Sequence, residues 1–328
     1  MPSTNTYNWA ILGCGKIAKK FSSDLQLLDK AVLYACAARS FEKAQKFSKE
    51  QGFQKAYGSY EEMVKDPEID IVYIATPHSH HKEHALLCLK HHKAVLCEKA
   101  FAINAKEVQQ MIATAKKHNT FLMEAFWTRF NPTFQKVLEI IASKKLGELI
   151  CVKSDFMFHP PFDPKSRLFD LSIGGGSLLD IGIYPVFTAL MTLGIPEKIS
   201  CDVTYSPTGS DESLRMWFQY PGHKTAVLAS SFACESLNES EFSFEKGSVR
   251  ISRENERPLV LNKKGQLEEI FIDNGNGIGY QFEAAHVMAC LDKELKESPD
   301  LPLSFSLELI QLLDRIRAKA KIVYPNHD

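Results

Sequence analysis

The first 125 residues alternate short apolar runs with segments of helical periodicity. In one of these segments Val108, Met111, Ile112 and Ala115 recur at i, i+3, i+4 and i+7, the spacing of one helix face. Strands separated by helices predict a parallel sheet with right-handed crossover connections. The runs expected to form strands are residues 7–12, 31–38, 71–75, 94–97 and 120–123.

The pattern changes after about residue 125. Apolar residues from Ile199 to Tyr205 alternate with polar ones, so this strand is expected to bury one face and expose the other. Further strand-like runs are residues 214–220, 225–233, 242–245, 249–251 and 259–261. Helical segments are expected after Asn131, after Gly176, over 280–295 and over 309–323.

These patterns predict an α/β protein with two domains, which suits a chain of 328 residues. Residues 1–125 are expected to form an N-terminal Rossmann dinucleotide-binding domain. Residues 126–328 are expected to form a C-terminal α+β domain with a large, mostly antiparallel open sheet, and the pattern permits this sheet to pair with a second copy of the chain. The pattern also allows the C-terminal helix to pack back on the first domain.

Charge and composition exclude several classes of protein. Lys and Arg number 39 and Asp and Glu 40, a net charge of −1 that argues against a nucleic-acid partner. Apolar runs all fall well short of 18 residues, so we expect no membrane span. The first six residues lack the features of a secretory leader, so we expect a cytoplasmic protein. Its eight scattered cysteines are then expected to be reduced.

A glycine motif follows the first predicted strand. It has the form G-x-G-x-x-A, in which the glycines permit a tight turn and the next helix offers its N–H groups to a pyrophosphate. The alternative is a glycine turn without a ligand. The residues expected to bind the cofactor here are Gly13, Gly15, Lys16, Ile17 and Ala18.

The end of the second strand carries Arg39 and Ser40, with Lys43 one turn later. An NAD site typically places a carboxylate here for the ribose 2′-hydroxyl, whereas a guanidinium suits the 2′-phosphate of NADP. We therefore favour NADP over NAD as the cofactor. The alternative is a solvated arginine at a strand end.

Two further segments follow predicted strands, at the sheet edge where ligands bind. Thr76, Pro77 and His78 are expected to line the cofactor or the substrate. His78 with His80 also permits a metal-hydrolase interpretation, but no suitable Asp, Glu or Cys partner lies at metal-ligand spacing, so no metal is expected. Lys99 could neutralise a developing alkoxide or help a nearby phenol to ionise. The alternative for Glu98 and Lys99 is a surface ion pair.

Two segments in the middle of the chain hold candidate substrate residues. Trp127 and Arg129 would wall a substrate pocket or belong to the core at the domain junction. Asp180 and Tyr184 follow three glycines and are four residues apart, so they share one helix face and could form a proton-transfer set with a lysine. The alternative is a helix-terminal charge beside a core tyrosine.

Together these motifs resemble the Gfo/Idh/MocA oxidoreductase family. The matching pieces are the glycine motif, T-P-x-x-x-H at 76–81, E-K-A at 98–100 and G-G-G-x-x-x-D-x-G-x-Y at 174–184. Ala100 stands where the family usually has proline. The resemblance implies Lys99, Asp180 and Tyr184 as catalytic residues and adds His81, Glu98 and Lys99 to the cofactor site. The substrate residues it implies are Trp127, Arg129, Phe158, Asp180, Tyr184 and Phe282.

The resulting hypothesis is hydride transfer between NADP and a hydroxyl carbon of a sugar or cyclic trans-diol. Tyr184 would act as general base. Because a free phenol titrates at about pH 10, the charge of Lys99 is expected to assist it. Alternatives are another sugar or polyol dehydrogenase of the inositol or glucose type, a non-catalytic NADP-binding regulator, and NAD-assisted glycoside hydrolysis. The expected partners are a small-molecule substrate and a second copy of the chain in a homodimer or higher homo-oligomer.

Overall fold

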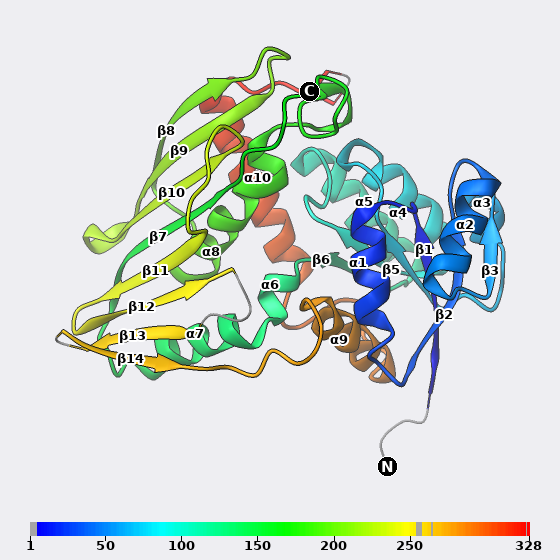
Figure 1. Ribbon diagram of the computed structural model, residues 1–328, viewed down its shortest axis with the longest axis horizontal. Coiled ribbons are helices and arrows are strands. Elements are labelled where there is room, and N and C mark those ends of the chain that lie inside the picture. The colour runs from blue at the N-terminus through cyan, green and yellow to red at the C-terminus, as the bar shows by residue number, and fades with distance from the viewer. Residues whose placement is uncertain (1–4, 254–257, 264, 326) are drawn as a thin grey trace. The chain divides into compact units, whose positions relative to one another are not determined.

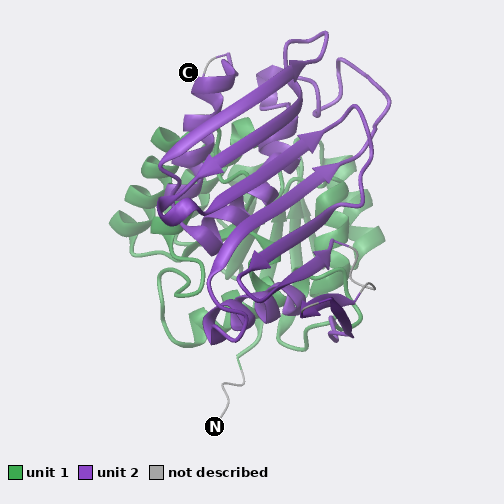
Figure 2. Cartoon of the chain, turned by 90° about the vertical axis from the view of Figure 1, so that its left-hand side faces the viewer, with its two compact units in different colours: residues 1–130, 275–307 green, residues 131–274, 308–328 purple. Residues whose placement is uncertain are grey.

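The computed structural model describes residues 5–253, 258–263, 265–325 and 327–328. Residues 1–4, which begin the segment expected to lack a leader, lie outside the described part. The chain divides into two compact units, shown in Figure 2. Unit 1 comprises residues 1–130 and 275–307, and unit 2 comprises residues 131–274 and 308–328.

Unit 1 is built on a six-stranded parallel sheet in the order β3-β2-β1-β4-β5-β6 (Figure 1). The strand order reverses between β1 and β4, the point at which sheets of this kind bind ligands at their carboxyl edge. The predicted Rossmann sheet is therefore confirmed. The strands are β1 (Tyr7–Leu12), β2 (Ala31–Ala37), β3 (Lys55–Tyr57), β4 (Ile71–Ile74), β5 (Ala94–Glu98) and β6 (Leu122–Ala125).

Several helices of unit 1 begin with a side-chain cap. Asn104 accepts a hydrogen bond from the Glu107 N–H at 2.9 Å, and Ser59 accepts one from the Glu62 N–H at 3.3 Å. The helices are α1 (Lys16–Leu25), α2 (Phe41–Gln51), α3 (Tyr60–Met63), the 3₁₀ turn η1 (His78–His80), α4 (His81–Lys90), α5 (Ala105–His118), α6 (Trp127–Phe130) and α9 (Tyr280–Asp292).

Helix α9 packs within unit 1, although the predicted boundary at residue 125 assigns it to the second domain. The buried carboxylate of Asp24 accepts the N–H groups of Ile278, Gly279 and Tyr280 at 3.0, 2.9 and 2.8 Å. At the other end of α9, Asp292 accepts a hydrogen bond from Tyr7 at 2.8 Å. These long-range contacts join residues 275–307 to unit 1.

Unit 2 contains an eight-stranded sheet in the order β14-β13-β12-β11-β7-β10-β9-β8. Only the β7–β10 pair is parallel among the described strand pairs, which confirms the predicted mostly antiparallel sheet. The strands are β7 (Leu149–Met157), β8 (Lys198–Tyr205), β9 (Asp211–Gln219), β10 (Thr225–Ser231), β11 (Glu239–Phe244), β12 (Gly247–Ser252), β13 (Leu259–Lys263) and β14 (Gln266–Ile270).

One face of this sheet is covered by the helices of unit 2. On β9, Leu214, Met216 and Phe218 are buried while Arg215 and Trp217 are exposed, the alternation expected of a half-covered sheet. The helices are α7 (Pro132–Ser143), α8 (Ile183–Leu193) and α10 (Leu303–Ala320), whose first residues belong to unit 1. Figure 1 shows α8 and α10 beside the long strands.

The stretch Leu171–Leu193 is long and apolar enough to pass a length-and-composition test for a membrane span, with a mean hydropathy of 1.4. Uninterrupted apolar runs along the chain predict no such stretch. It comprises a 3₁₀ turn η2 (Leu171–Ile173), a π-helical turn η3 (Leu178–Gly182) and α8. In the most apolar 18-residue part of this stretch, 83% of the window is buried inside the protein, as in a core helix.

Candidate active site

The loop after β1 passes very close to the loop after β4. Gly13 has φ of +101°, and a Cβ there would lie 2.9 Å from Cγ2 of Thr76 and 3.0 Å from the carbonyl oxygen of Ala75. Glycine is therefore required at this position. Gly15 begins α1 without a capping side chain, and the first turn carries no acidic residue. This helix terminus fits a pyrophosphate of a dinucleotide.

The loop after β2 presents positive charge. Arg39 and Lys43 are exposed, at the end of β2 and in the first turn of α2. Ser40 has a local role because its hydroxyl accepts the Lys43 N–H at 3.3 Å and donates to Glu42 at 2.6 Å. The two cations, rather than the serine hydroxyl, are the groups placed to meet a phosphate.

His81 links two loops at the carboxyl edge of the sheet. It is fully buried, with Nδ1 2.8 Å from the Ala100 carbonyl oxygen and Nε2 2.7 Å from that of Thr76. Burial lowers the pKa of His81 to about 4, so the imidazole is neutral at physiological pH. His78 packs edge-on against it at 5.6 Å between ring centroids. The structure thus places His81 as a positioning group behind the loop, with Pro77 preceding the η1 turn.

The end of β5, next to Lys99, is fixed by hydrogen bonds to the buried side chain of Glu98. Glu98 is buried and accepts hydrogen bonds from the Tyr73 hydroxyl and, at 3.2 Å, from the Lys99 N–H. Lys99 is half-buried, and the peptide bond to the buried Ala100 is cis. Glu98 is thus engaged in the interior, with the Tyr73 hydroxyl and the Lys99 N–H among its partners.

Two further buried carboxyl groups lie in the electrostatic surroundings of Glu98. Glu124, at the end of β6, accepts the Phe101 N–H at 3.2 Å, and burial raises its pKa to about 7. Burial raises the pKa of Glu283, a fully buried residue of α9, well above its usual range, and Glu98 and Asp24 act in the same direction. Sequence reasoning missed both, since a single acid in a strand or a helix gives no sign along the chain that it will be buried.

In unit 2, Asp180 lies in the π-helical turn η3 and Tyr184 in the first turn of α8. Asp180 is nearly buried and pairs with Arg167, whose Nη1 is 2.8 Å from Oδ1 and whose Nη2 is 3.5 Å from Oδ2. The Arg253 guanidinium lies over the Tyr184 ring at 3.9 Å and over the Phe156 ring at 4.2 Å. Neither arginine is identified by the sequence motifs.

Two of the three glycines before this turn, Gly175 and Gly176, serve the protein's own packing. A Cβ at Gly176 would lie 2.1 Å from Oδ1 of Asp211, and one at Gly175 would lie 2.7 Å from the Asp170 backbone. Asp211 is fully buried and accepts the Leu178 N–H at 2.6 Å and the Ser177 hydroxyl at 3.1 Å. Asp211 therefore approaches the backbone closely at Gly176 and fixes the start of η3.

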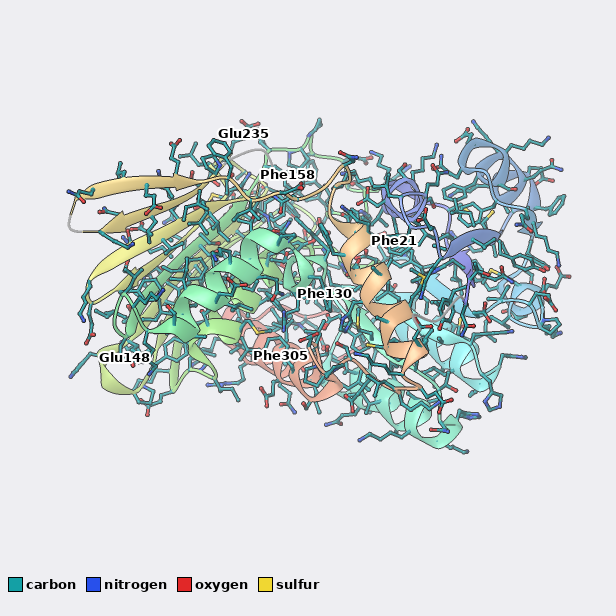
Figure 3. All side chains as sticks on the ribbon, turned by 90° about the horizontal axis from the view of Figure 1, so that it is seen from below. Phe21, Phe130, Glu148, Phe158, Glu235 and Phe305 are labelled. Atoms are coloured by element: carbon teal, nitrogen blue, oxygen red, sulfur yellow. The ribbon has the colours of Figure 1, made fainter. Side chains whose placement is uncertain are left out.

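Aromatic side chains surround the Asp180–Tyr184 turn. Phe156 lies 5.6 Å from Tyr184 and 6.2 Å from Phe158, measured between ring centroids. Phe158 follows β7, is labelled in Figure 3, and packs edge-on against Phe232 at 5.2 Å. Unit 2 therefore brings together three of the predicted substrate residues, Phe158, Asp180 and Tyr184.

The other predicted substrate residues belong to unit 1. Trp127 packs on Tyr280 at 5.9 Å between centroids, and Phe282 approaches Gly275. Arg129 donates from Nε to the Asp300 carbonyl oxygen at 2.7 Å and from Nη2 to the Asp300 carboxylate at 3.2 Å. Arg129 thereby ties α6 to the loop before α10.

The histidines after β4 do not form a metal centre in the part of the chain that the structure describes. His80 stacks on His84, and Nδ1 of His84 lies 3.0 Å from the Thr76 hydroxyl oxygen. Within the described ranges, no three His, Cys, Asp or Glu side chains gather in a way that could hold a metal ion.

Known proteins match the chain over nearly its whole length. Residues 7–126 match the "Oxidoreductase family, NAD-binding Rossmann fold", and residues 134–250 match the "GFO/IDH/MocA C-terminal domain". A Xenopus tropicalis protein named trans-1,2-dihydrobenzene-1,2-diol dehydrogenase is 37% identical over 329 residues, covering 97% of this chain and 99% of its own.

Two solved structures share the fold. Levoglucosan dehydrogenase in complex with NADH and L-sorbose has a TM-score of 0.87 at 19% identity, over 97% of each chain. A 3-ketoreductase from Actinomadura kijaniata in complex with NADP has a TM-score of 0.86 at 22% identity, over 96% of this chain and 98% of its own. The chain belongs to the Gfo/Idh/MocA oxidoreductase family and is a dehydrogenase with an NAD(P)-binding Rossmann domain.

Proposed function

We propose that this chain transfers a hydride between NADP and a hydroxyl carbon of a cyclic trans-diol or a sugar such as D-xylose. The observation that carries the proposal is the Asp180–Tyr184 turn, in which a carboxylate and a phenol are each held by an arginine among aromatic rings. The diol part of the proposal is supported by the name of the 37% identical relative. Aromatic walls suit both a cyclic diol and the apolar face of a pyranose.

In the proposed hydride transfer, Tyr184, Asp180 and Lys99 have different roles. The bound nicotinamide supplies the hydride acceptor or donor. Tyr184 receives the proton of the substrate hydroxyl, and the Arg253 guanidinium over its ring holds the ring in position. Asp180, fixed by Arg167, orients the substrate hydroxyl. Lys99 balances the charge of the developing alkoxide.

The cofactor proposed is NADP rather than NAD. Arg39 and Lys43 are exposed cations at the β2 end, where an NAD site typically has a carboxylate. The remaining cofactor contacts are assigned to the loops already described. They comprise Gly13, Gly15, Lys16, Ile17, Ala18 and Ser40 from the first two loops, and Thr76, Pro77, His78, His81, Glu98 and Lys99 from the next two.

The proposed quaternary structure is a homodimer formed through the outer face of the unit 2 sheet. Two large apolar side chains, Trp217 and Val227, are each 39% exposed and lie opposite each other on β9 and β10. The proposed location is the cytoplasm, which is supported by eight free cysteines.

The proposed base is tested with Tyr184→Phe. Removing a general base typically costs about 10²–10⁴-fold in rate, so we expect kcat to fall by that factor while NADPH still binds. The matched control is Tyr220→Phe, since the buried Tyr220 hydroxyl has no hydrogen-bond partner among the described residues. Turnover of trans-diols, pentoses and hexoses is followed through the absorbance of the reduced cofactor. Full turnover by Tyr184→Phe would exclude this tyrosine as the base.

A further inference from the structure

Two cysteines meet beneath the glycine-rich loop. Cys14 is the residue between Gly13 and Gly15, and Cys36 lies near the end of β2. The backbone holds them together, because Ile11 is paired with Cys36 in the sheet and the Gly13 N–H donates to the Ala37 carbonyl oxygen at 3.0 Å. Each thiol lies in the electrostatic surroundings of the other, and Sγ of Cys14 contacts the carbonyl oxygen of Ala37, the residue after Cys36.

The remaining contacts of the two sulfurs are to backbone oxygens. Sγ of Cys14 is 3.4 Å from the Ala37 carbonyl oxygen, and Sγ of Cys36 is 3.3 Å from that of Ala44. Cys36 is fully buried, whereas Cys14 is 7% exposed at the loop surface. An oxidant therefore meets Cys14 first, and Cys36 stands directly behind it.

The two thiols differ in pKa because their surroundings differ. The neighbouring Cys36 thiol lowers the pKa of Cys14 against the opposing effect of burial, and the charge of Lys43 adds to the lowering. The contact with Cys14, together with burial, raises the pKa of Cys36. Cys14 also precedes the N-terminus of α1, where the helix dipole favours a thiolate. Cys14 is thus the nucleophile of the pair and Cys36 its protonated partner.

We propose that Cys14 and Cys36 form a reversible oxidation site, in which a hydroperoxide converts the two thiols into a disulfide beneath the pyrophosphate loop. In the first step the Cys14 thiolate attacks one peroxide oxygen, so an S–O bond forms, the O–O bond breaks and an alcohol or water leaves. In the second step the Cys36 sulfur attacks Cys14, an S–S bond forms, and the sulfenic oxygen leaves as water with the Cys36 proton. Both sulfurs are oxidised and the peroxide is reduced.

The disulfide would change the cofactor loop. A disulfide holds its sulfurs about 2 Å apart, closer than any thiol–thiol hydrogen bond, so Cys14 is drawn toward β2. Thr76 and Ala75, which approach Gly13 closely, follow β4 on the side of β1 opposite to β2, so this movement would draw the loop away from them. We expect NADPH binding to weaken by about tenfold, a change of about 1.4 kcal/mol. This effect rests on the proposed cofactor, whereas formation of the disulfide does not.

The experiment treats the purified full chain with hydrogen peroxide and maps its thiols by mass spectrometry without reduction. We expect a cross-linked peptide pair containing Cys14 and Cys36, lighter by two hydrogen atoms, that dithiothreitol restores. NADPH binding, read from tryptophan fluorescence, should weaken after oxidation and recover on reduction. NADPH added before the peroxide should slow the cross-link.

Two variants and a control keep the test decisive. Cys36→Ser, and Cys36→Ala should the serine fold poorly, keep Cys14 but should lose the cross-link and the recovery by dithiothreitol. Cys234→Ser removes an exposed thiol of unit 2 and should behave like the unmodified chain. Absence of the Cys14–Cys36 peptide, or reversible inactivation that persists in Cys36→Ser, would overturn the proposal. A cross-link without any NADPH binding would instead count against the proposed function.

Discussion

Individual charged side chains are expected to determine how this protein binds its cofactor, and Arg39 is an example. It is exposed at the end of β2 next to the loop expected to receive the adenosine ribose. A hydrogen bond to a charged group contributes about 1.5–3 kcal/mol, so Arg39→Ala should weaken NADPH binding by roughly 10–150-fold. NADH binding should hardly change, because it lacks the 2′-phosphate.

Titration of both reduced cofactors by fluorescence checks this prediction. Lys46→Ala is the matched control, since it removes an exposed cation of α2 that pairs with Glu50. Equal weakening of NADPH and NADH by Arg39→Ala would remove this arginine from cofactor discrimination.

Asp211 gives stability a pH dependence of the opposite sign to that of an ordinary ion-paired acid. Burial raises its pKa from 3.8 to about 7. The native state therefore binds more protons than the unfolded chain between these values, and this contribution to stability is lost as the pH rises from about 4 to about 7. Asp211→Asn cannot titrate, yet its amide oxygen can still accept the Leu178 N–H.

We expect the wild type to lose unfolding free energy relative to Asp211→Asn as the pH rises to about 7. Above that pH the difference between the two proteins should stay constant. Urea unfolding at a series of pH values measures it. Glu124 titrates in the same pH range, but it is present in both proteins, so its contribution cancels when the two unfolding free energies are subtracted. A difference that is constant with pH would contradict the assigned titration.

The candidate catalytic residues could be predicted from the sequence, but the side chains that surround them and hold them in place could not. Lys99 and Tyr184 stand in motifs whose spacing is visible along the chain. Arg253 reaches the Tyr184 ring from a strand end far away in sequence, and no local pattern marks it. Glu283 likewise becomes a buried acid only because α9 packs against unit 1. Contacts between distant segments are what sequence periodicity cannot report.

At the scale of elements, the start of α9 is held mainly by one side chain. The Asp24 carboxylate accepts three backbone N–H groups at the start of α9 and replaces an ordinary N-cap. Leaving these donors without an acceptor costs about 1–3 kcal/mol for each buried group, so Asp24→Ala should destabilise the chain by at least that amount. Asp24→Asn keeps one acceptor oxygen and should lose less.

Urea unfolding of both variants tests the cap. Asp29→Ala, which removes an exposed carboxylate from the loop after α1, is the control and should leave stability unchanged within about 0.5 kcal/mol. If Asp24→Ala were as stable as this control, the three hydrogen bonds would not be what holds the start of α9.

The elements that the sequence predicts well are those with an uninterrupted apolar signature. Strands β1 and β4 of the parallel sheet are buried on both faces and therefore read as continuous apolar runs. Strand β14 is polar and almost wholly exposed, so neither periodicity marks it. Strand β3 is only three residues long and is defined by its pairing with β2.

At the scale of the whole molecule, the sheet of unit 2 presents a long open face, seen in Figure 2. Trp217 and Val227 are paired on this face, and the next row pairs Asp202 with Arg215. Opposite charges and apolar groups on one patch allow it to be complementary to itself, as a two-fold symmetric interface requires.

The proposed homodimer makes a direct prediction for this face. Trp217→Asp should leave the fold intact, because the side chain points away from the covered face, but should convert the dimer to monomer, since a buried unpaired carboxylate is costly at an interface. Sedimentation velocity at micromolar concentration measures the change. Leu267→Asp on β14, where the leucine is 71% exposed, is the matched control and should remain dimeric. A wild-type chain that sediments as monomer, or a Trp217→Asp variant that stays dimeric, would show that the copies do not associate through this sheet.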